Sequence, residues 1–474
     1  MLQRLPLLFF LIAAEHFFAL FNAPGFLDAA GKTTIAQLQA YVSLRQLDVS
    51  PVLDAAASFI SDTLGKSVAG DIDRISDRLQ LFATIGLGRK EVPITVDGCS
   101  PGTATLDSIA GLGGDLGMVL RNATLGSCDG SRLNATVKSN DDRTFTATVF
   151  TSQADGFGVI SDIDDTVKIT NTLDTVKVLE ATFIDDPAPV SGMPELYSYL
   201  NNALSNPAFF YVSGSPFQLY PFLNDFISTT YPNGPIFLQN LTFTNIEGLI
   251  DLVTDNDEIF EYKVGQIETI HGMYPGKKFL TVGDSTQKDP ETYGEIFRRF
   301  GPDFVSCIWI RRVDGANNTD ARFTSAFEGV PSDRFRVYND SDIADTLPTF
   351  DVVNAAQAYT WIFDHATLAA PSLLLILFSS FSVPPSRPVF SRICTLSSAM
   401  GNGAKAAQKR ERNAEKNGGK GSKSQSKVNE AAKNIVCSIC RQPFLITTRA
   451  PALEEHSQNK HSKTMAECFP DAAK

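Results

Sequence analysis

The chain has 474 residues, too many for one ordinary hydrophobic core, so its length predicts two or three domains. Its composition, 43% hydrophobic and 10% aromatic, is typical of a globular protein, and seven cysteines are too few for a disulfide-stabilised miniprotein. The net charge of −12 is uneven, because residues 400–474 contain 14 basic and 7 acidic residues, which leaves 27 and 46 for the rest. An acidic body therefore carries a basic tail.

Residues 1–23 resemble a secretory signal peptide. Arg4 supplies a positive charge, and the apolar stretch Leu5–Ala14 follows it. Glu15 and His16 interrupt the stretch early, so a membrane anchor or a wrongly assigned first exon is an alternative. We expect a secreted or secretory-pathway protein, with a cytoplasmic enzyme at a membrane surface as the alternative.

Two further features agree with export. Cys99 and Cys128 flank a Gly-rich stretch and are able to pair if the chain is exported, although the sequence leaves their pairing open. Five N-x-S/T sequons predict a glycoprotein on the same route, although several would arise by chance in this length. They are at Asn122, Asn134, Asn240, Asn317 and Asn339.

Two segments are expected before the central part of the chain. Residues 34–89 are predicted to be helical, because apolar residues such as Leu38 and Val42 recur at helical spacing. Residues 90–154 contain short alternating runs separated by Gly, Asp, Asn and Ser, which indicates a small accessory β-sandwich.

Residues 155–350 alternate between strand-like apolar runs and helix-like segments, which is typical of an α/β fold with a parallel sheet. The expected strands are Phe157–Ile160, Phe209–Val212, Ile236–Leu238 and Phe279–Val282, and the expected helices are near Met193–Leu204, Phe217–Ile227 and Val264–Met273. In such sheets ligands bind at the carboxyl ends of the strands, so polar residues directly after these runs are the first candidates for chemistry.

The pattern ends beyond residue 350. Residues 351–399 are predicted to be an unstructured junction; the apolar patch Leu368–Val383 is short for a membrane span, and a GPI-type tail is the alternative. Residues 400–433 are rich in Lys, Gly, Ser and Asn and are expected to be disordered.

The strongest motif is Asp162-Ile163-Asp164-Asp165-Thr166, directly after a predicted strand. Asp162 is suited to attack phosphorus as a nucleophile, and Asp164 to protonate the leaving group and then activate water. Thr166 completes the motif. Alone, such a motif is also compatible with a solvated acidic turn.

Four residues that follow in order supply the other parts of a phosphoryl-transfer site. Ser213 ends a predicted strand and Lys263 is expected to begin a helix, and both are suited to bind the phosphoryl oxygens of a substrate. Asp284 follows the end of another predicted strand, and Asp289 comes five residues later. Both offer carboxylate ligands for Mg²⁺. The occurrence of all four residues in this order argues against a coincidental match to such a site.

These motifs resemble the haloacid dehalogenase superfamily, and within it the fungal actin-patch phosphatidate phosphatases. The similar strings are Val159–Lys168, Tyr211–Tyr220, Val282–Ser285 and Lys288–Glu291. The resemblance implies a Rossmann-like parallel sheet preceded by a β-sandwich. It also implies a phosphoaspartate on Asp162, with Asp164 as acid/base, and Mg²⁺ bound by Asp162, the backbone carbonyl of Asp164 and Asp284, with Asp289 in support.

The substrate is expected to be phosphatidate or a related lipid phosphate at a membrane or micelle surface. Connections of about 50 residues between Asp162, Ser213 and Lys263 leave room for only a minimal cap, and an uncapped site admits bulky substrates. Phosphoproteins and other phosphomonoesters are the alternatives. A lipid-phosphate-binding pseudophosphatase is less favoured, because Asp162 and Asp164 are both present.

Residues 434–474 contain four ligand-type side chains at spacings close to those of a C2H2 zinc finger. They are Cys437, Cys440, His456 and His461. The basic segment before them makes nucleic acid a candidate partner of the tail, and a nucleic-acid-binding protein the alternative function. From Met400 the sequence resembles small eukaryotic zinc-finger proteins with a basic start like that of the EDRK-rich factors. We therefore expect that two neighbouring genes were joined.

Overall fold

The computed structural model describes residues 16–44, 50–79, 81–82, 84–109, 116–139, 143–240 and 256–346, and short pieces of residues 435–470. The chain divides into two units, residues 1–399 and residues 400–474. The predicted junction 351–399 and the basic segment 400–433 lie outside the described residues. Among the helices that the structure describes, none is long and apolar enough to cross a membrane.

The first part of the larger unit is a ten-stranded β domain. Its strands pair in the order β6-β8-β3-β2-β10-β9-β5-β7, with β1 and β4 attached to β3. The pairing is antiparallel except between β10 and β2, and the end strand β7 also contacts β8, so the sheet curves back on itself. The bounds are β1 His16–Leu20, β2 Ala23–Leu27, β3 Thr34–Leu44, β4 Ile85–Gly86, β5 Glu91–Val96, β6 Cys99–Pro101, β7 Thr103–Asp107, β8 Met118–Cys128, β9 Arg132–Lys138 and β10 Thr144–Thr151.

The prediction of a helix was wrong for the start of residues 34–89, because β3 occupies residues 34–44. Leu38 and Val42 are four residues apart, a spacing that fits both a helix and one face of a strand. Ala36 and Ala40 are buried with them, and this two-residue period is that of a strand. The second half of the segment does contain helices, α1 (Ser50–Leu64) and α2 (Ile72–Leu79).

The β domain also extends further toward the N-terminus than residues 90–154. β1 pairs with β3, from His16 opposite Leu44 to Leu20 opposite Ala40. The expected signal-peptide boundary at residue 23 therefore runs through this sheet, while residues 1–15 lie outside the described residues.

A disulfide bond joins Cys99 to Cys128. The two residues face each other on the neighbouring strands β6 and β8. The bond links a three-residue edge strand to the long strand β8, so the pairing that the sequence left open is present.

The second part is a six-stranded sheet in which every described pair of neighbouring strands is parallel, in the order β13-β12-β11-β14-β15-β16. The bounds are β11 Phe157–Ser161, β12 Ala208–Pro216, β13 Ile236–Gln239, β14 Lys278–Asp284, β15 Val305–Arg311 and β16 Phe335–Tyr338. Successive residues of β11, Val159 and Ile160, are buried in two different hydrophobic clusters, one on each face of the sheet. A sheet buried on both faces needs such nearly continuous apolar strands, which explains the runs seen in the sequence.

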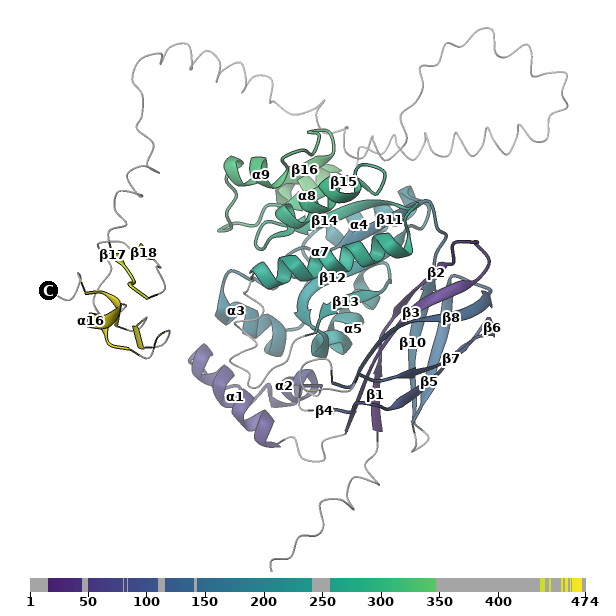
Figure 1. Cartoon of the computed structure of the whole chain (residues 1–474), viewed down its shortest axis with the longest axis horizontal. Coiled ribbons are helices and arrows are strands. Elements are labelled where there is room, and N and C mark those ends of the chain that lie inside the picture. The colour runs from purple at the N-terminus through teal and green to yellow at the C-terminus, as the bar shows by residue number, and fades with distance from the viewer. Residues whose placement is uncertain are drawn as a thin grey trace, which may run out of the picture. The chain divides into compact units, whose positions relative to one another are not determined.

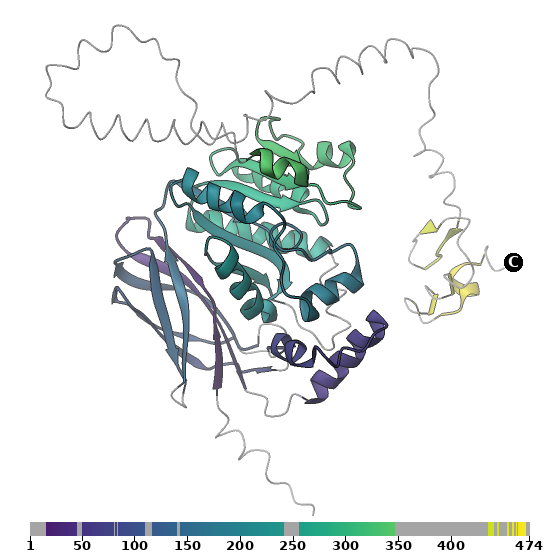
Figure 2. The same cartoon turned by 180° about the vertical axis from the view of Figure 1, so that it is seen from behind.

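Helices cover both faces of this sheet (Figures 1 and 2). α4 and α5 pack in one cluster, and α7 and α8 pack in the other. The bounds are α3 Thr175–Leu179, the π-helix η2 Glu180–Ile184, α4 Met193–Ala203, the 3-10 helix η3 Phe217–Leu219, α5 Tyr220–Thr230, α7 Asn256–Met273, α8 Asp289–Phe300, α9 Asp320–Ala326 and α10 Asp340–Thr346. The alternation of strands and helices predicted after residue 156 is thus confirmed.

The described part of the smaller unit includes a short hairpin and the helix α16. β17 (Ile435–Val436) pairs antiparallel with β18 (Pro443–Phe444), and α16 spans Met465–Cys468. Its buried cluster contains Cys437, Leu453, Cys468 and Phe469.

Candidate active site

Three neighbouring strands end at one place in the parallel sheet. β11 lies between β12 and β14, and all three run in the same direction. Asp162 directly follows β11, Ser213 lies in β12 and Asp284 is the last residue of β14. The carboxyl edge of the sheet therefore brings together residues that are more than 120 positions apart in the chain.

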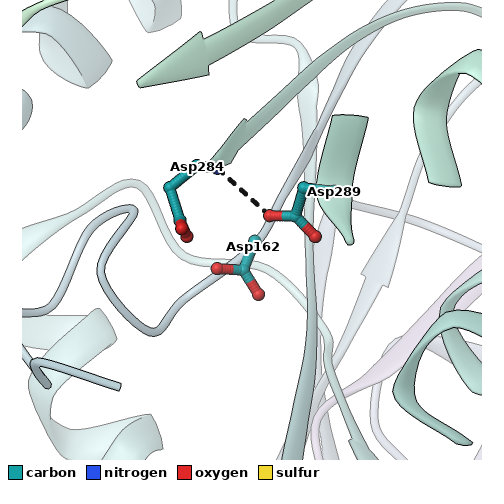
Figure 3. Close-up of side chains that lie close together, drawn as sticks. All are labelled: Asp162, Asp284 and Asp289. Atoms are coloured by element: carbon teal, nitrogen blue, oxygen red, sulfur yellow. Dashed lines mark hydrogen bonds between the residues drawn. The ribbon is translucent and has the colours of Figure 1, made fainter. Parts of the chain in front are cut away.

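Asp162, Asp284 and Asp289 point toward one another at this edge (Figure 3). Each offers a carboxylate oxygen, and these atoms lie within 4.8 Å of one another. The backbone nitrogen of Asp284 donates to Asp289 Oδ2 at 3.2 Å, the contact that is dashed in Figure 3. Gly283 is needed beside this contact, since a Cβ there would clash with the Asp289 carboxylate.

Lys263 partly balances the charge of these carboxylates. Its Nζ donates to Asp162 Oδ1 and to Asp289 Oδ1, each at 2.6 Å. All three side chains are almost completely buried. Although burial alone would lower the pKa of Lys263, the two carboxylates raise it, so the lysine is cationic. Three buried acids and one lysine still leave an excess of negative charge.

The remaining groups fit a divalent cation. Asp162 Oδ2 is buried and has no hydrogen-bond donor in the described structure. Thr166 donates from Oγ1 to Asp284 Oδ2 at 2.9 Å, which orients that carboxylate. Convergent carboxylate oxygens with an orphaned buried acceptor are the donor set that Mg²⁺ or a similar hard cation prefers.

Electrostatics point the same way. Burial raises the pKa of Asp162 well above its usual range, and the Lys263 ammonium opposes this shift only in part. Burial and the neighbouring Asp289 raise the pKa of Asp284 to about 7. Both acids are thus difficult to ionise together without a further positive charge in the site.

The Asp164 carboxylate has hydrogen-bond partners that the three converging acids do not share. Its Oδ2 accepts from Ser213 Oγ at 2.9 Å and from Ser215 Oγ at 2.8 Å, and its Oδ1 accepts from Thr170 Oγ1 at 2.7 Å. Burial alone would raise the pKa of Asp164, but the Lys168 ammonium and these hydroxyl groups lower it. The expected metal contact through the backbone carbonyl of Asp164 stays a prediction.

Two expectations about the phosphate-binding residues change. Lys263 does not begin a helix: α7 starts at Asn256, seven residues earlier, and so Lys263 lies within the helix. The prediction placed the helix at the apolar run from Val264 and left out the acidic first turn with Asp257 and Glu258, although acidic residues are common in the first turn of a helix. The hydroxyl group of Ser213 donates to the Asp164 carboxylate.

Asp165 and Lys168 also belong to the site, although neither was predicted as a site residue. Asp165 adopts a left-handed backbone conformation, with φ of 59°. Its carboxylate accepts from the backbone nitrogens of Thr170, Asn171 and Thr172. Lys168 is buried beside it and donates to Thr170 Oγ1 at 2.9 Å. The available signals in the sequence were the third acid, Asp165, three residues after Asp162, and Lys168, six residues after it.

A small pocket borders Asp164. Its polar end contains Asp164, Thr170 and Ser215. Beyond them it is lined by apolar side chains from α3, η2 and η3, which include Val178, Leu179, Phe183 and Leu219. The connection from β11 to β12 contains only α3, η2 and α4, while residues 241–255 lie outside the described part.

The tail contains part of the predicted zinc site. Cys437 Sγ and His461 Nε2 lie 3.5 Å apart, a separation suited to two ligands of one zinc ion. Cys440 and His456 lie outside the described residues. Cys468 is buried in the cluster with Cys437.

Comparisons with known proteins divide the chain in the same way. Residues 157–312 match the family described as phosphatidate phosphatase APP1, catalytic domain. Residues 436–472 match a zinc-binding family, and residues 400–434 match the N-terminal family of small EDRK-rich factor 1/2-like proteins.

Three relatives also match separate parts of the chain. Phosphatidate phosphatase APP1 of Saccharomyces cerevisiae is 35% identical over 159 residues, 33% of this chain and 26% of that protein. The uncharacterized protein C29B5.04c of Schizosaccharomyces pombe is 27% identical over 161 residues, 33% and 25% of the two chains. The chain thus spans about a quarter of the length of these two relatives. The uncharacterized protein At2g23090 of Arabidopsis thaliana is 39% identical over 75 residues, 16% of this chain and 96% of that protein.

Proposed function

We propose that the larger unit is a lipid phosphate phosphatase, because residues 157–312 match the catalytic-domain family of phosphatidate phosphatase APP1. Residues 400–474 belong to the family of At2g23090. The reaction of the larger unit is hydrolysis of a phosphate monoester through a phosphoaspartate, as in the haloacid dehalogenase superfamily. The observation that carries this proposal is the buried, unpartnered Asp162 Oδ2 beside Lys263 and two further acids.

In the first step the Asp162 carboxylate attacks phosphorus, and the bond from phosphorus to the leaving oxygen breaks. Asp164, across from the nucleophile, gives its proton to the departing alkoxide. The lowered pKa of Asp164 describes the site without substrate. A bound phosphate dianion brings a like charge close to this carboxylate and favours its protonation.

In the second step water attacks the phosphoaspartate and releases inorganic phosphate. Asp164, now ionised, takes the proton of that water, so both carboxylates return to their starting states. Ser213, Ser215 and Thr170 hold the Asp164 carboxylate in place through both steps. Lys263 holds Asp162 and Asp289 at fixed positions.

Asp162, Asp284 and Asp289 would hold Mg²⁺, with Thr166 fixing the orientation of Asp284. When bound, this ion supplies the positive charge that lets an anionic nucleophile approach an anionic phosphate.

The pocket beside Asp164 supports a lipid as the leaving group. The group that leaves must lie next to the acid that protonates it, and the pocket starts there. Its cavity volume of about 30 Å³ is too small for an acyl chain, so the wall of Val178, Leu179 and Phe183 supports only an apolar group next to the leaving oxygen, rather than the hydroxyl groups of a sugar.

The test uses the full chain, because a fragment starting near residue 85 would remove β1, β2 and β3 from the β domain. Purified protein is assayed with phosphatidate and lysophosphatidate in mixed micelles, sugar phosphates and phosphopeptides. We expect the highest kcat/KM on the lipids, loss of turnover with EDTA, and recovery with Mg²⁺. A preference for sugar phosphates or phosphopeptides contradicts the lipid assignment, and turnover in excess chelator contradicts the metal.

The gain in melting temperature from Mg²⁺ is predicted to increase with pH. Asp284 has a pKa of about 7 in the metal-free folded protein, against 3.8 for an ordinary aspartate. Its contribution to stability is therefore fully present below about pH 4 and is lost as pH rises through 7. Mg²⁺ replaces the proton, so its stabilising effect should be larger near pH 8 than near pH 6. Thermal melting with and without Mg²⁺ measures this; a gain that does not depend on pH would disprove it.

We also propose a secretory route for the phosphatase unit. The Cys99–Cys128 bond favours an oxidising compartment. The sequon asparagines Asn122, Asn134, Asn317 and Asn339 are exposed. A cytoplasmic enzyme at a membrane surface is the alternative, and it predicts no change in mass on treatment with an N-glycosidase.

The tail is proposed to bind zinc through Cys437, Cys440, His456 and His461, and the Cys437–His461 proximity supports this. Adding zinc to the metal-free chain should increase the protection of tail amides from hydrogen exchange, and Cys437→Ser should prevent this. Ser438→Ala is the matched control, since Ser438 is exposed. Equal protection with and without zinc would exclude a metal-folded module.

We further propose that residues 400–474 come from a neighbouring gene. They form a separate unit and correspond to nearly all of a plant protein. Long transcripts that stop before the codon for Met400 would support a junction, whereas continuous transcripts over residues 350–420 would establish one natural chain. In a natural chain, a salt-dependent shift with RNA or DNA would favour nucleic acid as a partner of the tail.

A further inference from the structure

Apolar side chains are exposed beside the candidate active site. Six large hydrophobic residues are prominently exposed in the described part of the chain, and three of them fall within eight positions. These are Ile169, Leu173 and Val176, which are 41%, 51% and 38% exposed. The other three, Ile85, Leu120 and Ile439, are scattered over distant parts of the sequence. Single exposed apolar residues are ordinary, but a group in one short segment needs a reason.

The segment 169–176 is attached directly to the catalytic loop. The Asp165 carboxylate accepts from the backbone nitrogens of Thr170, Asn171 and Thr172, and Thr170 Oγ1 donates to Asp164. The segment is thus held by hydrogen bonds whose acceptors are two acids of the motif. Whatever contacts its apolar side chains is therefore brought close to Asp164.

The same stretch of chain continues into the wall of the pocket. Asp174 caps α3 by accepting from the backbone nitrogens of Val176 and Lys177. The next residues, Val178 and Leu179, are buried and line the pocket that begins at Asp164. Exposed and pocket-lining apolar residues are therefore neighbours in one continuous element.

Charges around the segment are mixed. Lys66 pairs with Glu180 at 2.5 Å, and Arg74 pairs with Asp186 at 3.3 Å. Asp174 and Lys177 are both exposed. No single sign of charge dominates, so attraction to a surface of opposite charge would be weak, and apolar contact is the stronger driving force.

We propose that residues 169–176 are a lipid-contacting segment that inserts Ile169, Leu173 and Val176 into the boundary between the headgroups and acyl chains of a lipid surface. The proposal rests on the proposed function, because a lipid phosphate substrate lies in such a surface. Insertion brings the headgroup to Asp164 while the acyl chains stay in the lipid layer.

Vesicle co-sedimentation of the full chain tests this, with Asp162→Asn as the background so that phosphatidate is not consumed. The vesicles are phosphatidylcholine alone or phosphatidylcholine with a minor fraction of phosphatidate. Leu173→Asp is compared with Leu120→Asp, which makes the same change at a residue of similar exposure on β8. We expect Leu173→Asp to weaken binding to both kinds of vesicle by about tenfold, Leu120→Asp to leave it unchanged, and binding to persist at high salt.

Several outcomes would overturn the lipid-contacting segment: no vesicle binding by the parent protein, equal binding by both variants, or release of the protein by salt alone. Val176→Asp is a second variant if Leu173→Asp melts early. The failure of the proposed function is separate, because it would appear as no hydrolysis of any phosphate ester by protein with Asp162 intact. With active protein, Leu173→Asp should retain its rate on a soluble phosphomonoester and lose rate only on vesicles.

Discussion

Replacing Asp162 with asparagine (Asp162→Asn) is expected to lower kcat by about four orders of magnitude while the protein stays folded. The amide preserves the shape of the side chain but loses the anionic oxygen that attacks phosphorus and one ligand of the proposed cation. Asp162 is buried with Asp284 and Asp289 against one lysine, so removing a negative charge also relieves repulsion. The melting temperature without metal should therefore be unchanged or higher.

The measurement is single-turnover hydrolysis of a soluble phosphomonoester, with thermal melting alongside. Asp303→Asn is the matched control, because the Asp303 side chain is 97% exposed and lies away from the cluster. Turnover by Asp162→Asn within about tenfold of the parent protein would remove Asp162 as the nucleophile.

Replacing Lys263 with methionine (Lys263→Met) should give the largest loss of stability, about 3–5 kcal/mol in the free energy of unfolding of the larger unit. Methionine fills a similar volume but leaves Asp162 and Asp289 buried without their cationic partner, which is 2.6 Å from each. Hydrolysis should be lost as well, since the two acids are no longer held in position.

The loss of stability should depend on pH in a defined direction. Without Lys263, the folded-state pKa of the buried Asp162 carboxylate rises further above its unfolded value, because the ammonium no longer opposes the effect of burial. The contribution of such groups is present at low pH and is lost as pH rises through the folded pKa, so Lys263→Met should be most destabilised at high pH. Denaturant titrations at several pH values measure this effect.

Lys278→Met is the control for this prediction. Lys278 is 45% exposed and lies 3.7 Å from the exposed Asp303, so its ion pair contributes about 1 kcal/mol or less. A loss for Lys263→Met no larger than that of Lys278→Met would show that the buried network does not hold the site together.

The order of chemical groups along the chain was predictable from sequence. Asp162 and Asp284 each occur where a buried apolar run ends, and the carboxyl ends of parallel strands meet at one edge. Periodicity and this rule together bring the residues to one site without knowledge of side-chain positions. The sequence left open whether Cys99 and Cys128 pair, because neither the strand β6 nor its register with β8 was apparent from it.

Only the tertiary structure decided the roles that depend on side-chain direction. Asp162 and Asp164 are two residues apart, yet one faces Lys263 and Asp289 while the other faces Ser213 and Ser215. Sequence spacing does not determine this, because both residues lie beyond the end of β11, where the regular alternation of a strand no longer fixes the direction of side chains.

The same limit explains the wrong helix at residues 34–44. Leu38 and Val42 satisfy a helical spacing, but β3 is chosen by pairing with β8, about 80 residues later in the chain. The local sequence determines which residues are apolar. Pairing with distant segments determines whether those residues form one face of a helix or one face of a strand. The exposed group of Ile169, Leu173 and Val176 was hidden for the same reason, since burial is a property of the folded chain and not of any residue type.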